Sequence, residues 1–185
     1  MSDSIVKDSN IVNKSIASPI LLLDVDGVLN PIGQMLHPEA EANWAFNDVF
    51  YSCDESGNWP LRISPEMGKA IRAFGCDIRW LTTWHDLAHK NIGEPVFGWP
   101  KFPVQSYPRM SSSYWKLTAV RELLEEEGPH VIWLDDDIEQ FMIGEELWEL
   151  DPHNRLMTVC PNTAIGLTKD DIQKIKNFVE SVTKE

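Results

Sequence analysis

Two short apolar runs in this sequence each end in a cluster of aspartates. The runs are residues 20–23 (ILLL) and residues 131–134 (VIWL), and acidic residues follow each of them at once. The carboxylates that follow the two runs are Asp24, Asp26, Asp135, Asp136 and Asp137. A short continuous apolar run bounded by turn residues is typical of a buried parallel strand. Because ligands of open α/β sheets bind at the carboxyl ends of the strands, we expect these carboxylates to meet at one edge of a sheet.

Carboxylates that converge on one point repel one another strongly unless a cation neutralises them. All-oxygen ligands favour Mg²⁺ over zinc or copper, so the pattern predicts a hard-metal site. The alternative is that these acids are turn and helix N-cap residues, because Asp is common where a strand gives way to a helix. Two clusters, each directly after an apolar run, favour the metal site. An EF-hand is excluded, because Val28 and Leu29 stand where its loop requires Asp or Asn and then Gly.

The composition fits a single globular domain with a strong negative charge. The chain has 185 residues, of which 43% are hydrophobic and 24% charged, close to the average for soluble globular proteins. Its 16 basic and 29 acidic side chains give a formal charge of −13, and 12 of the acids lie in residues 122–151, which hold no Lys or Arg. This balance disfavours nonspecific binding to nucleic acid, but a nucleic-acid end bound at one local site is compatible with it.

The cysteines and the amino-terminal segment indicate a cytoplasmic protein. Cys53, Cys76 and Cys160 are odd in number and widely spaced, so they fit neither a disulfide framework nor a CxxC metal knuckle, and we expect reduced thiols. No apolar run approaches the roughly 20 residues that span a bilayer, and residues 1–15 lack the apolar segment of a secretory signal. We therefore expect a cytoplasmic location and no membrane partner.

The rest of the chain alternates between strand and helix patterns, which predicts a parallel sheet covered on both faces. Residues 1–18 are expected to form a mobile tail. Residues 19–185 are expected to form a single domain with an aromatic-rich flap at about 30–63, too short for a large cap domain. The predicted strands cover residues 20–23, 76–82, 131–134 and 157–160, and the predicted helices cover residues 65–74, 85–92, 114–127, 138–150 and 166–182. The expected fold class is therefore a three-layer, Rossmann-like α/β domain.

The segment LLLDVDGVLN at residues 21–30 resembles the first motif of the haloacid dehalogenase (HAD) superfamily of phosphotransferases. The superfamily's second motif is a Thr or Ser that ends the second strand. Thr82 in WLTTW matches it, with Thr83 as the alternative.

Two further motifs follow in the family's order. The third, a Lys at the start of a later helix, resembles Lys116 in SSYWKLTAV. The fourth, an acidic pair after an apolar strand, resembles Asp135 and Asp136 in VIWLDDD. The resemblance therefore covers about residues 19–182, and it implies a HAD-like fold for the whole domain.

The resemblance implies a phosphatase that forms a covalent intermediate. Asp24 would attack phosphorus and form an aspartyl phosphate, which splits one difficult displacement into two easier ones. Asp26 would be the general acid for the leaving oxygen and then the base for the hydrolytic water, and its presence favours phosphoryl transfer over dehalogenation. Thr82 and Lys116 would hold the phosphoryl oxygens.

The resemblance also implies a Mg²⁺ ion that offsets the repulsion between nucleophile and substrate. Its ligands would be Asp24, the backbone carbonyl of Asp26, and Asp136. Asp135 is either a direct ligand or the residue that orients Lys116, and the sequence does not separate these roles.

The resemblance suggests two kinds of substrate. The motif DxDGVL resembles the first motif of the small deoxyribonucleotidases, which implies a free nucleotide as the substrate. The forms WLTTWHDLAH, WLDDD and GLTKDDI resemble the HAD domain of bacterial RNA-repair proteins, which implies a nucleic-acid end. The acidic balance favours a nucleotide or other phosphorylated small molecule. Trp84 is the best candidate to stack on the substrate, and Thr83 beside it is a second candidate to bind it.

Alternatives to this interpretation come from other classes of protein. Besides a nucleotide or metabolite phosphatase, the chain could be a polynucleotide end phosphatase or a noncatalytic module that binds phospho-ligands or proteins. The intact motif residues argue against the noncatalytic module. His85 and His89, spaced i and i+4 in HDLAH, could bind a transition metal from one helix face, but no third ligand accompanies them.

Overall fold

The computed structural model describes residues 17–53, 57–105, 115–125, 128–141, 151 and 153–184. The strands are β1 (Ile20–Leu23), β2 (Asn47–Cys53), β3 (Gly57–Ile63), β4 (Asp77–Trp80), β5 (Val131–Leu134) and β6 (Leu156–Val159). The helices are α1 (Pro38–Asn43), α2 (Pro65–Arg72), α3 (Asp86–Ala88), the π-helical turn η1 (His89–Gly93), α4 (Trp115–Glu125), α5 (Ile138–Phe141) and α7 (Lys169–Val182). None of the helices in these ranges is long and apolar enough to cross a membrane.

Four strands form one parallel sheet in the order β4-β1-β5-β6. The chain passes from β1 to β4 on one side and then crosses to β5 on the other side of β1. This reversal is a topological switch point, and in open α/β sheets the ligand crevice lies at the carboxyl ends of the strands beside it. The parallel sheet that the sequence predicts is therefore confirmed, and its switch point falls at β1.

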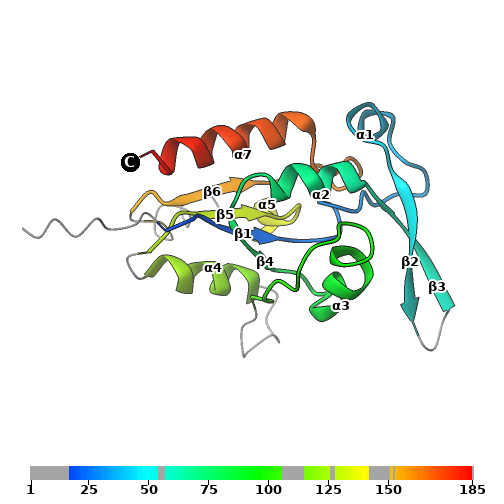
Figure 1. Cartoon of the computed structure of the whole chain (residues 1–185), viewed down its shortest axis with the longest axis horizontal. Helices are drawn as coiled ribbons and strands as arrows, with labels where there is room; N and C mark the ends of the chain where they lie inside the picture. The colour runs from blue at the N-terminus through cyan, green and yellow to red at the C-terminus, as the bar shows by residue number, and fades with distance from the viewer. Residues whose placement is uncertain are drawn as a thin grey trace, which may run out of the picture.

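Helices cover both faces of this sheet, with α2 and α7 on one face and α4 on the other (Figure 1). The alternation of side chains along β1 explains the two layers of core. Leu21 and Leu23 pack in one buried cluster with residues of α2 and α7, whereas Ile20 and Leu22 pack in a second cluster with residues of α4. The three-layer α/β arrangement follows from a strand that is buried on both faces.

The helices that pack on the sheet begin where their sequences predict. Ser64 caps α2 by accepting from the Met67 backbone N–H at 3.3 Å. Thr168 caps α7 in a reciprocal capping box with Asp171. The described part of α4 starts at Trp115, and the predicted cap at residues 111–113 lies outside the described residues.

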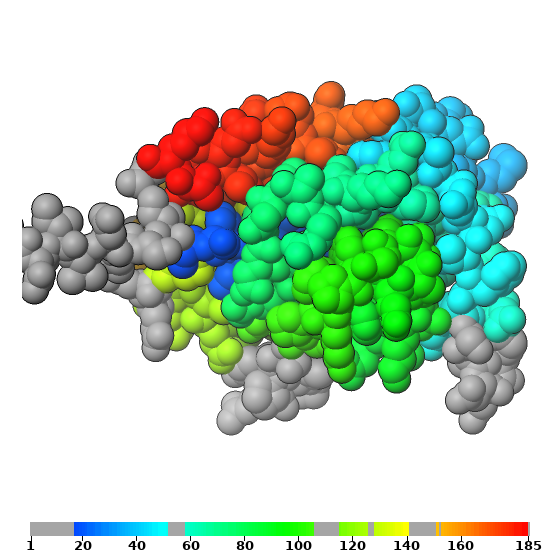
Figure 2. Space-filling view, in the orientation of Figure 1, coloured from blue at the N-terminus to red at the C-terminus, as the bar shows by residue number. Residues whose placement is uncertain are grey.

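The flap is an antiparallel hairpin of β2 and β3, preceded by the short helix α1, which the sequence does not predict. The hairpin lies at the carboxyl end of the main sheet (Figure 1). Its strand β2 packs against η1, and in the space-filling view the hairpin atoms (cyan) lie directly against the segment that follows β4 (green) (Figure 2). The flap is therefore next to the edge where the candidate site residues are expected.

Three sequence-based expectations need correction or fall outside the described residues. The helix predicted at 85–92 is a short α3 followed by the π turn η1, because His85 adopts a positive φ of 49° and cannot belong to an α-helix. Residues 1–16 of the predicted tail lie outside the described part of the chain. Residues 142–150 of the helix predicted at 138–150 lie outside it as well, and α5 covers Ile138–Phe141.

Candidate functional site

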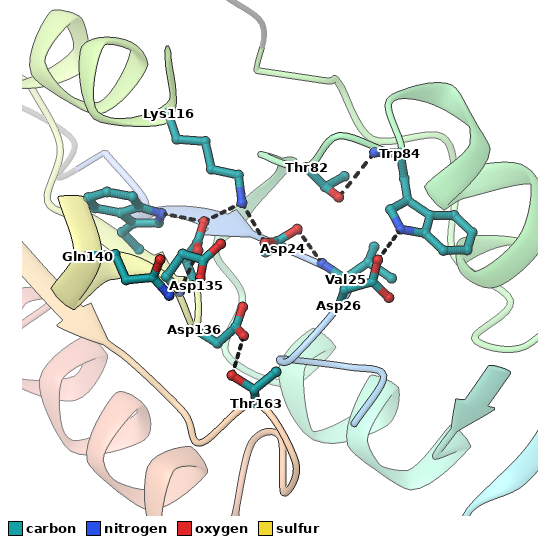
Figure 3. Close-up of polar contacts among 12 residues, drawn as sticks. Asp24, Val25, Asp26, Thr82, Trp84, Lys116, Asp135, Asp136, Gln140 and Thr163 are labelled. Carbon is teal, nitrogen blue, oxygen red and sulfur yellow. Dashed lines mark hydrogen bonds and ion pairs between the residues drawn. The ribbon is translucent and has the colours of Figure 1, made fainter. Parts of the chain in front are cut away.

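The carboxyl ends of β1 and β5 bring Asp24 and Asp135 to the same level of the sheet. Leu23 and Leu134 are paired in the parallel register, so the residue that follows each strand emerges beside the other. The Asp24 backbone N–H donates to the Leu134 carbonyl at 3.1 Å, which continues this pairing past the strands. The sequence-based expectation that both clusters reach one edge is therefore confirmed for these two residues (Figure 3).

Lys116 of α4 joins the two carboxylates. Its Nζ lies 2.5 Å from Asp24 Oδ2 and 2.7 Å from Asp135 Oδ2, and all three side chains are buried. Burial alone would lower the pKa of Lys116, but the charges of Asp24 and Asp135 and the hydrogen bonds to them raise it above its ordinary value. Lys116 is therefore a cation held at the centre of the site.

Asp24 is the most electrostatically perturbed carboxylate of the site. Burial raises its pKa to about 6, Lys116 opposes this rise, and the charge of Asp135 adds to it. One Asp24 oxygen accepts from Lys116, and the other accepts from the Val25 backbone N–H at 2.7 Å. A carboxyl with this pKa loses its proton readily near neutral pH and is fixed in orientation at both oxygens.

Thr82 lies beside Asp24, two residues after the end of β4. The residue is fully buried, and its Oγ1 accepts from the Trp84 backbone N–H at 3.2 Å. This leaves the hydroxyl proton free to donate to Asp24, and that hydrogen bond lowers the pKa of Asp24. Thr83, the alternative motif residue, is exposed, so the geometry favours Thr82 as the residue of the site.

Asp135 uses both of its oxygens within the protein. Besides Lys116, its Oδ2 accepts from the Trp133 indole N–H at 3.4 Å, and its Oδ1 accepts from the Asp137 backbone N–H at 3.0 Å. The residue is fully buried. These contacts fit a carboxylate that orients Lys116, the second of the two roles that the sequence allows.

Asp136 lies next to the loop that follows β1. A Cβ built on Gly27 would lie 2.1 Å from the Asp136 Cγ, so a larger residue would displace the Asp136 carboxylate, and the φ of +69° at this position also favours glycine. Thr163 Oγ1 donates to Asp136 Oδ2 at 2.7 Å. Burial raises the pKa of Asp136, although this hydrogen bond opposes the rise.

Asp24, Asp135 and Asp136 form a group that could hold a metal ion. Each offers one carboxylate oxygen, and these oxygens all lie within 4.8 Å of one another. Lys116 pairs with Asp24 and Asp135, and Asp136 adds a third carboxylate, so the cluster retains negative charge that a cation would neutralise. An all-oxygen donor set of this kind fits Mg²⁺ or another hard cation.

Asp26 is turned away from this group. Its Oδ2 accepts from the Trp84 indole N–H at 2.8 Å, and its Oδ1 accepts from the Asn30 side-chain amide at 2.9 Å. The carboxylate of Asp26 is accordingly separate from the three clustered carboxylates (Figure 3).

The two histidines do not form the pair on one helix face that their spacing suggests. His85 precedes α3 with a positive φ, and its ring lies 6.5 Å from that of Trp115. His89 follows α3, and its Nε2 lies 3.9 Å from a Glu94 carboxylate oxygen. In the described ranges, the group with three metal-ligating side chains is the aspartate cluster.

Three contacts of the site were not found from the sequence. Thr163 follows β6, so the rule that ligands gather at the carboxyl ends of the strands could have indicated it. Asn30 lies four residues after Asp26, but a loop pattern does not show which way its side chain points. Tyr51 of the hairpin contacts the Trp84 ring with 4.9 Å between centroids, and no sequence pattern pairs these two positions.

No protein-family model matches this chain, and no curated protein matches it. The interpretation of the site therefore depends on its own geometry and charge.

Proposed function

We propose that the chain is a Mg²⁺-dependent phosphohydrolase of the HAD type, which cleaves a phosphate monoester through an aspartyl phosphate on Asp24. The observation that carries this proposal is the contact of one buried lysine, Lys116, with Asp24 and Asp135 at the switch point of a parallel sheet. A buried carboxylate beside a fixed cation suits a nucleophile that must approach a phosphoryl group of like charge.

The oxygen donors of the aspartate cluster fit a magnesium ion. Asp24 and Asp136 would hold it, together with the backbone carbonyl of Asp26, while Asp135 keeps Lys116 in place. When bound, the ion supplies positive charge that offsets the repulsion between the nucleophile and the phosphoryl oxygens.

The proposed reaction has two steps, formation of the aspartyl phosphate and its hydrolysis, and the same residues act in both. An Asp24 oxygen attacks phosphorus, a new P–O bond forms, and the ester P–O bond breaks as Asp26 gives its proton to the leaving oxygen. Asp26, now a carboxylate, then takes a proton from a water whose oxygen attacks phosphorus. The bond between phosphorus and the Asp24 oxygen breaks, inorganic phosphate leaves, and Asp24 is again a free carboxylate. Lys116 and Thr82 bind the phosphoryl oxygens during both steps.

The proposed substrate is a small phosphate monoester, such as a nucleotide or a phosphorylated metabolite. The chain carries a formal charge of −13, so a long polyanion gains little general attraction from it. A polynucleotide end is the other substrate that the proposal must be tested against.

The test is release of phosphate from p-nitrophenyl phosphate, a panel of nucleotides, and end-phosphorylated oligonucleotides, with Mg²⁺ or with EDTA. We expect turnover in Mg²⁺ only, and a fall of at least about 1,000-fold in Asp24→Asn. Asp170→Asn is the matched control, because Asp170 is an exposed aspartate in the first turn of α7, outside the site.

Two outcomes would redirect the proposal. Turnover of oligonucleotides alone, falling as salt rises, would favour the polynucleotide end phosphatase. Binding of Mg²⁺ without turnover of any ester, and no difference between wild type and Asp24→Asn, would favour the noncatalytic binding module.

A further inference from the structure

Both oxygens of the Asp26 carboxylate are fixed by side chains that the proposed chemistry does not otherwise use. The Trp84 indole N–H donates to Oδ2 at 2.8 Å, and the Asn30 amide donates to Oδ1 at 2.9 Å. Trp84 comes from the loop after β4, and Figure 3 shows its indole beside Asp26, whereas Asn30 comes from the loop after β1. A carboxylate held at both oxygens has its direction set by its two partners.

Each of these two donors is in turn held by the hairpin. The Trp84 ring packs edge-on against Tyr51 of β2, with centroids 4.9 Å apart and planes at 60°. The Asn30 side-chain oxygen accepts from the Arg62 backbone N–H of β3 at 3.0 Å. The two strands of the hairpin therefore contact the two partners of Asp26, one strand each.

The backbone around Trp84 is also held in an unusual conformation. His85, the next residue, has φ 49° and ψ −131°, which a residue with a Cβ adopts only where the surrounding structure holds it. Thr82 Oγ1 accepts from the Trp84 backbone N–H at 3.2 Å. Both features fix the backbone beside the indole that contacts Asp26, and strained backbone of this kind is concentrated at functional sites.

We propose that Trp84 and Asn30 are positioning residues for the general acid Asp26, and that the hairpin sets its direction through Tyr51 and the Arg62 backbone. The inference rests on the proposed function, in which Asp26 gives its proton to the leaving oxygen. As the ester P–O bond breaks, its electron pair stays on that oxygen, and the Asp26 proton neutralises it. A displacement of the acid by about 1 Å is enough to cost a large factor in rate.

How much the rate depends on this proton is set by the basicity of the leaving group. Esters with different leaving groups therefore distinguish a Trp84 that positions the acid from a Trp84 that only binds the substrate. Phenolate is a stronger base than p-nitrophenolate, so phenyl phosphate depends more on the acid than p-nitrophenyl phosphate does. The two esters present nearly the same ring to any aromatic side chain that stacks on the substrate. If Trp84 only stacked on the substrate, its loss would raise KM for both esters alike.

The experiment compares kcat/KM, which reports the step that breaks the ester bond, for these two esters in wild type and in Trp84→Phe, which keeps a ring but loses the N–H donor. We expect the ratio of kcat/KM for phenyl phosphate to kcat/KM for p-nitrophenyl phosphate to fall about 10-fold, part of the 100-fold or more that general acids contribute. Trp99→Phe is the matched control, because Trp99 is a buried tryptophan whose ring packs among Phe97, Phe102 and Trp80. We expect the control to leave the ratio unchanged.

Two further variants test whether the effect of Trp84 depends on Asp26 and whether it depends on the hairpin. In an Asp26→Asn background, Trp84→Phe should leave the ratio where Asp26→Asn alone puts it, because no acid remains to be positioned. Tyr51→Leu removes the edge-on contact of the hairpin and should lower the ratio in the same direction, by a smaller factor.

The outcomes that overturn the inference differ from those that overturn the proposed function. Absence of turnover in the wild type defeats the proposed function. Turnover in the wild type, with Trp84→Phe lowering kcat/KM equally for both esters, defeats the positioning role alone. A changed ratio in Trp84→Phe with an unchanged ratio in Tyr51→Leu defeats the part assigned to the hairpin.

Discussion

Replacing Asp24 by Asn should change how the stability of the metal-free protein depends on pH. Burial raises the pKa of Asp24 in the folded protein from its ordinary value of 3.8 to about 6. The folded state therefore binds this proton more tightly than the unfolded chain does. The stabilising contribution of the protonated carboxyl is fully present below about pH 4 and is lost as the pH rises through about 6.

The magnitude follows from the two pKa values. A difference of about 2.2 pH units, from 3.8 to about 6, corresponds to about 3 kcal/mol at about 1.36 kcal/mol per unit. Asn has no proton to lose, so the unfolding free energy of the Asp24→Asn protein does not include this pH-dependent contribution. Near pH 4, Asp24→Asn should match wild type, and near pH 8 it should be more stable by up to about 3 kcal/mol, or about 6 to 12 °C in Tm.

The assay is urea unfolding of both proteins in EDTA at intervals between pH 4 and pH 8. The quantity compared is the difference in unfolding free energy between variant and wild type, because titrations common to both proteins cancel in it. A difference that stays flat across this range would refute the reasoning. A difference of the opposite sign would mean that Lys116 outweighs burial in setting the pKa of Asp24.

Four other changes have expected outcomes. Gly27→Ala should lower stability by about 2 kcal/mol in thermal unfolding, because its Cβ meets Asp136 and its φ is positive; an unchanged Tm would contradict this close approach. Lys116→Met should cost about 3 to 5 kcal/mol at pH 8 and less at pH 5, where the buried carboxylates can protonate; urea unfolding showing equal losses at both pH values would argue against it. Thr163→Val should weaken Mg²⁺ binding about fivefold in calorimetry, for the loss of about 1 kcal/mol, and equal affinity would remove Thr163 from the site. A Mg²⁺ concentration 100 times the Kd should stabilise the wild type by about 2.7 kcal/mol, and EDTA should reverse it; a Tm indifferent to Mg²⁺ would contradict the metal site.

The sheet could be predicted from the sequence because its strands are buried on both faces. A strand with no solvent-facing side is a continuous apolar run, and Ile20–Leu23 and Val131–Leu134 begin and end where those runs do. Thr168 was found from its cap signature in the same way. The π turn at His89–Gly93 could not be predicted, because it depends on the conformation of His85 and on packing against the hairpin, which local patterns do not encode.

The site was predictable as far as it lies at strand ends. Asp24 and Asp135 follow paired strands, so the sheet itself brings them together once its topology is known. Lys116 comes from a helix on one face, and only the motif order indicated it. The hydrogen-bond partners of Asp26 could not be predicted from the sequence. Trp84 and Asn30 lie in loops, where the direction of a side chain depends on tertiary contacts.

The measurement that tests the central claim most directly is mass spectrometry of the protein quenched in acid during turnover of p-nitrophenyl phosphate with Mg²⁺. The proposed function predicts phosphate covalently attached to Asp24, absent in EDTA and absent in Asp24→Asn. Release of phosphate with no covalent label on Asp24, or with a label on a different residue, would contradict an aspartyl-phosphate mechanism at this site.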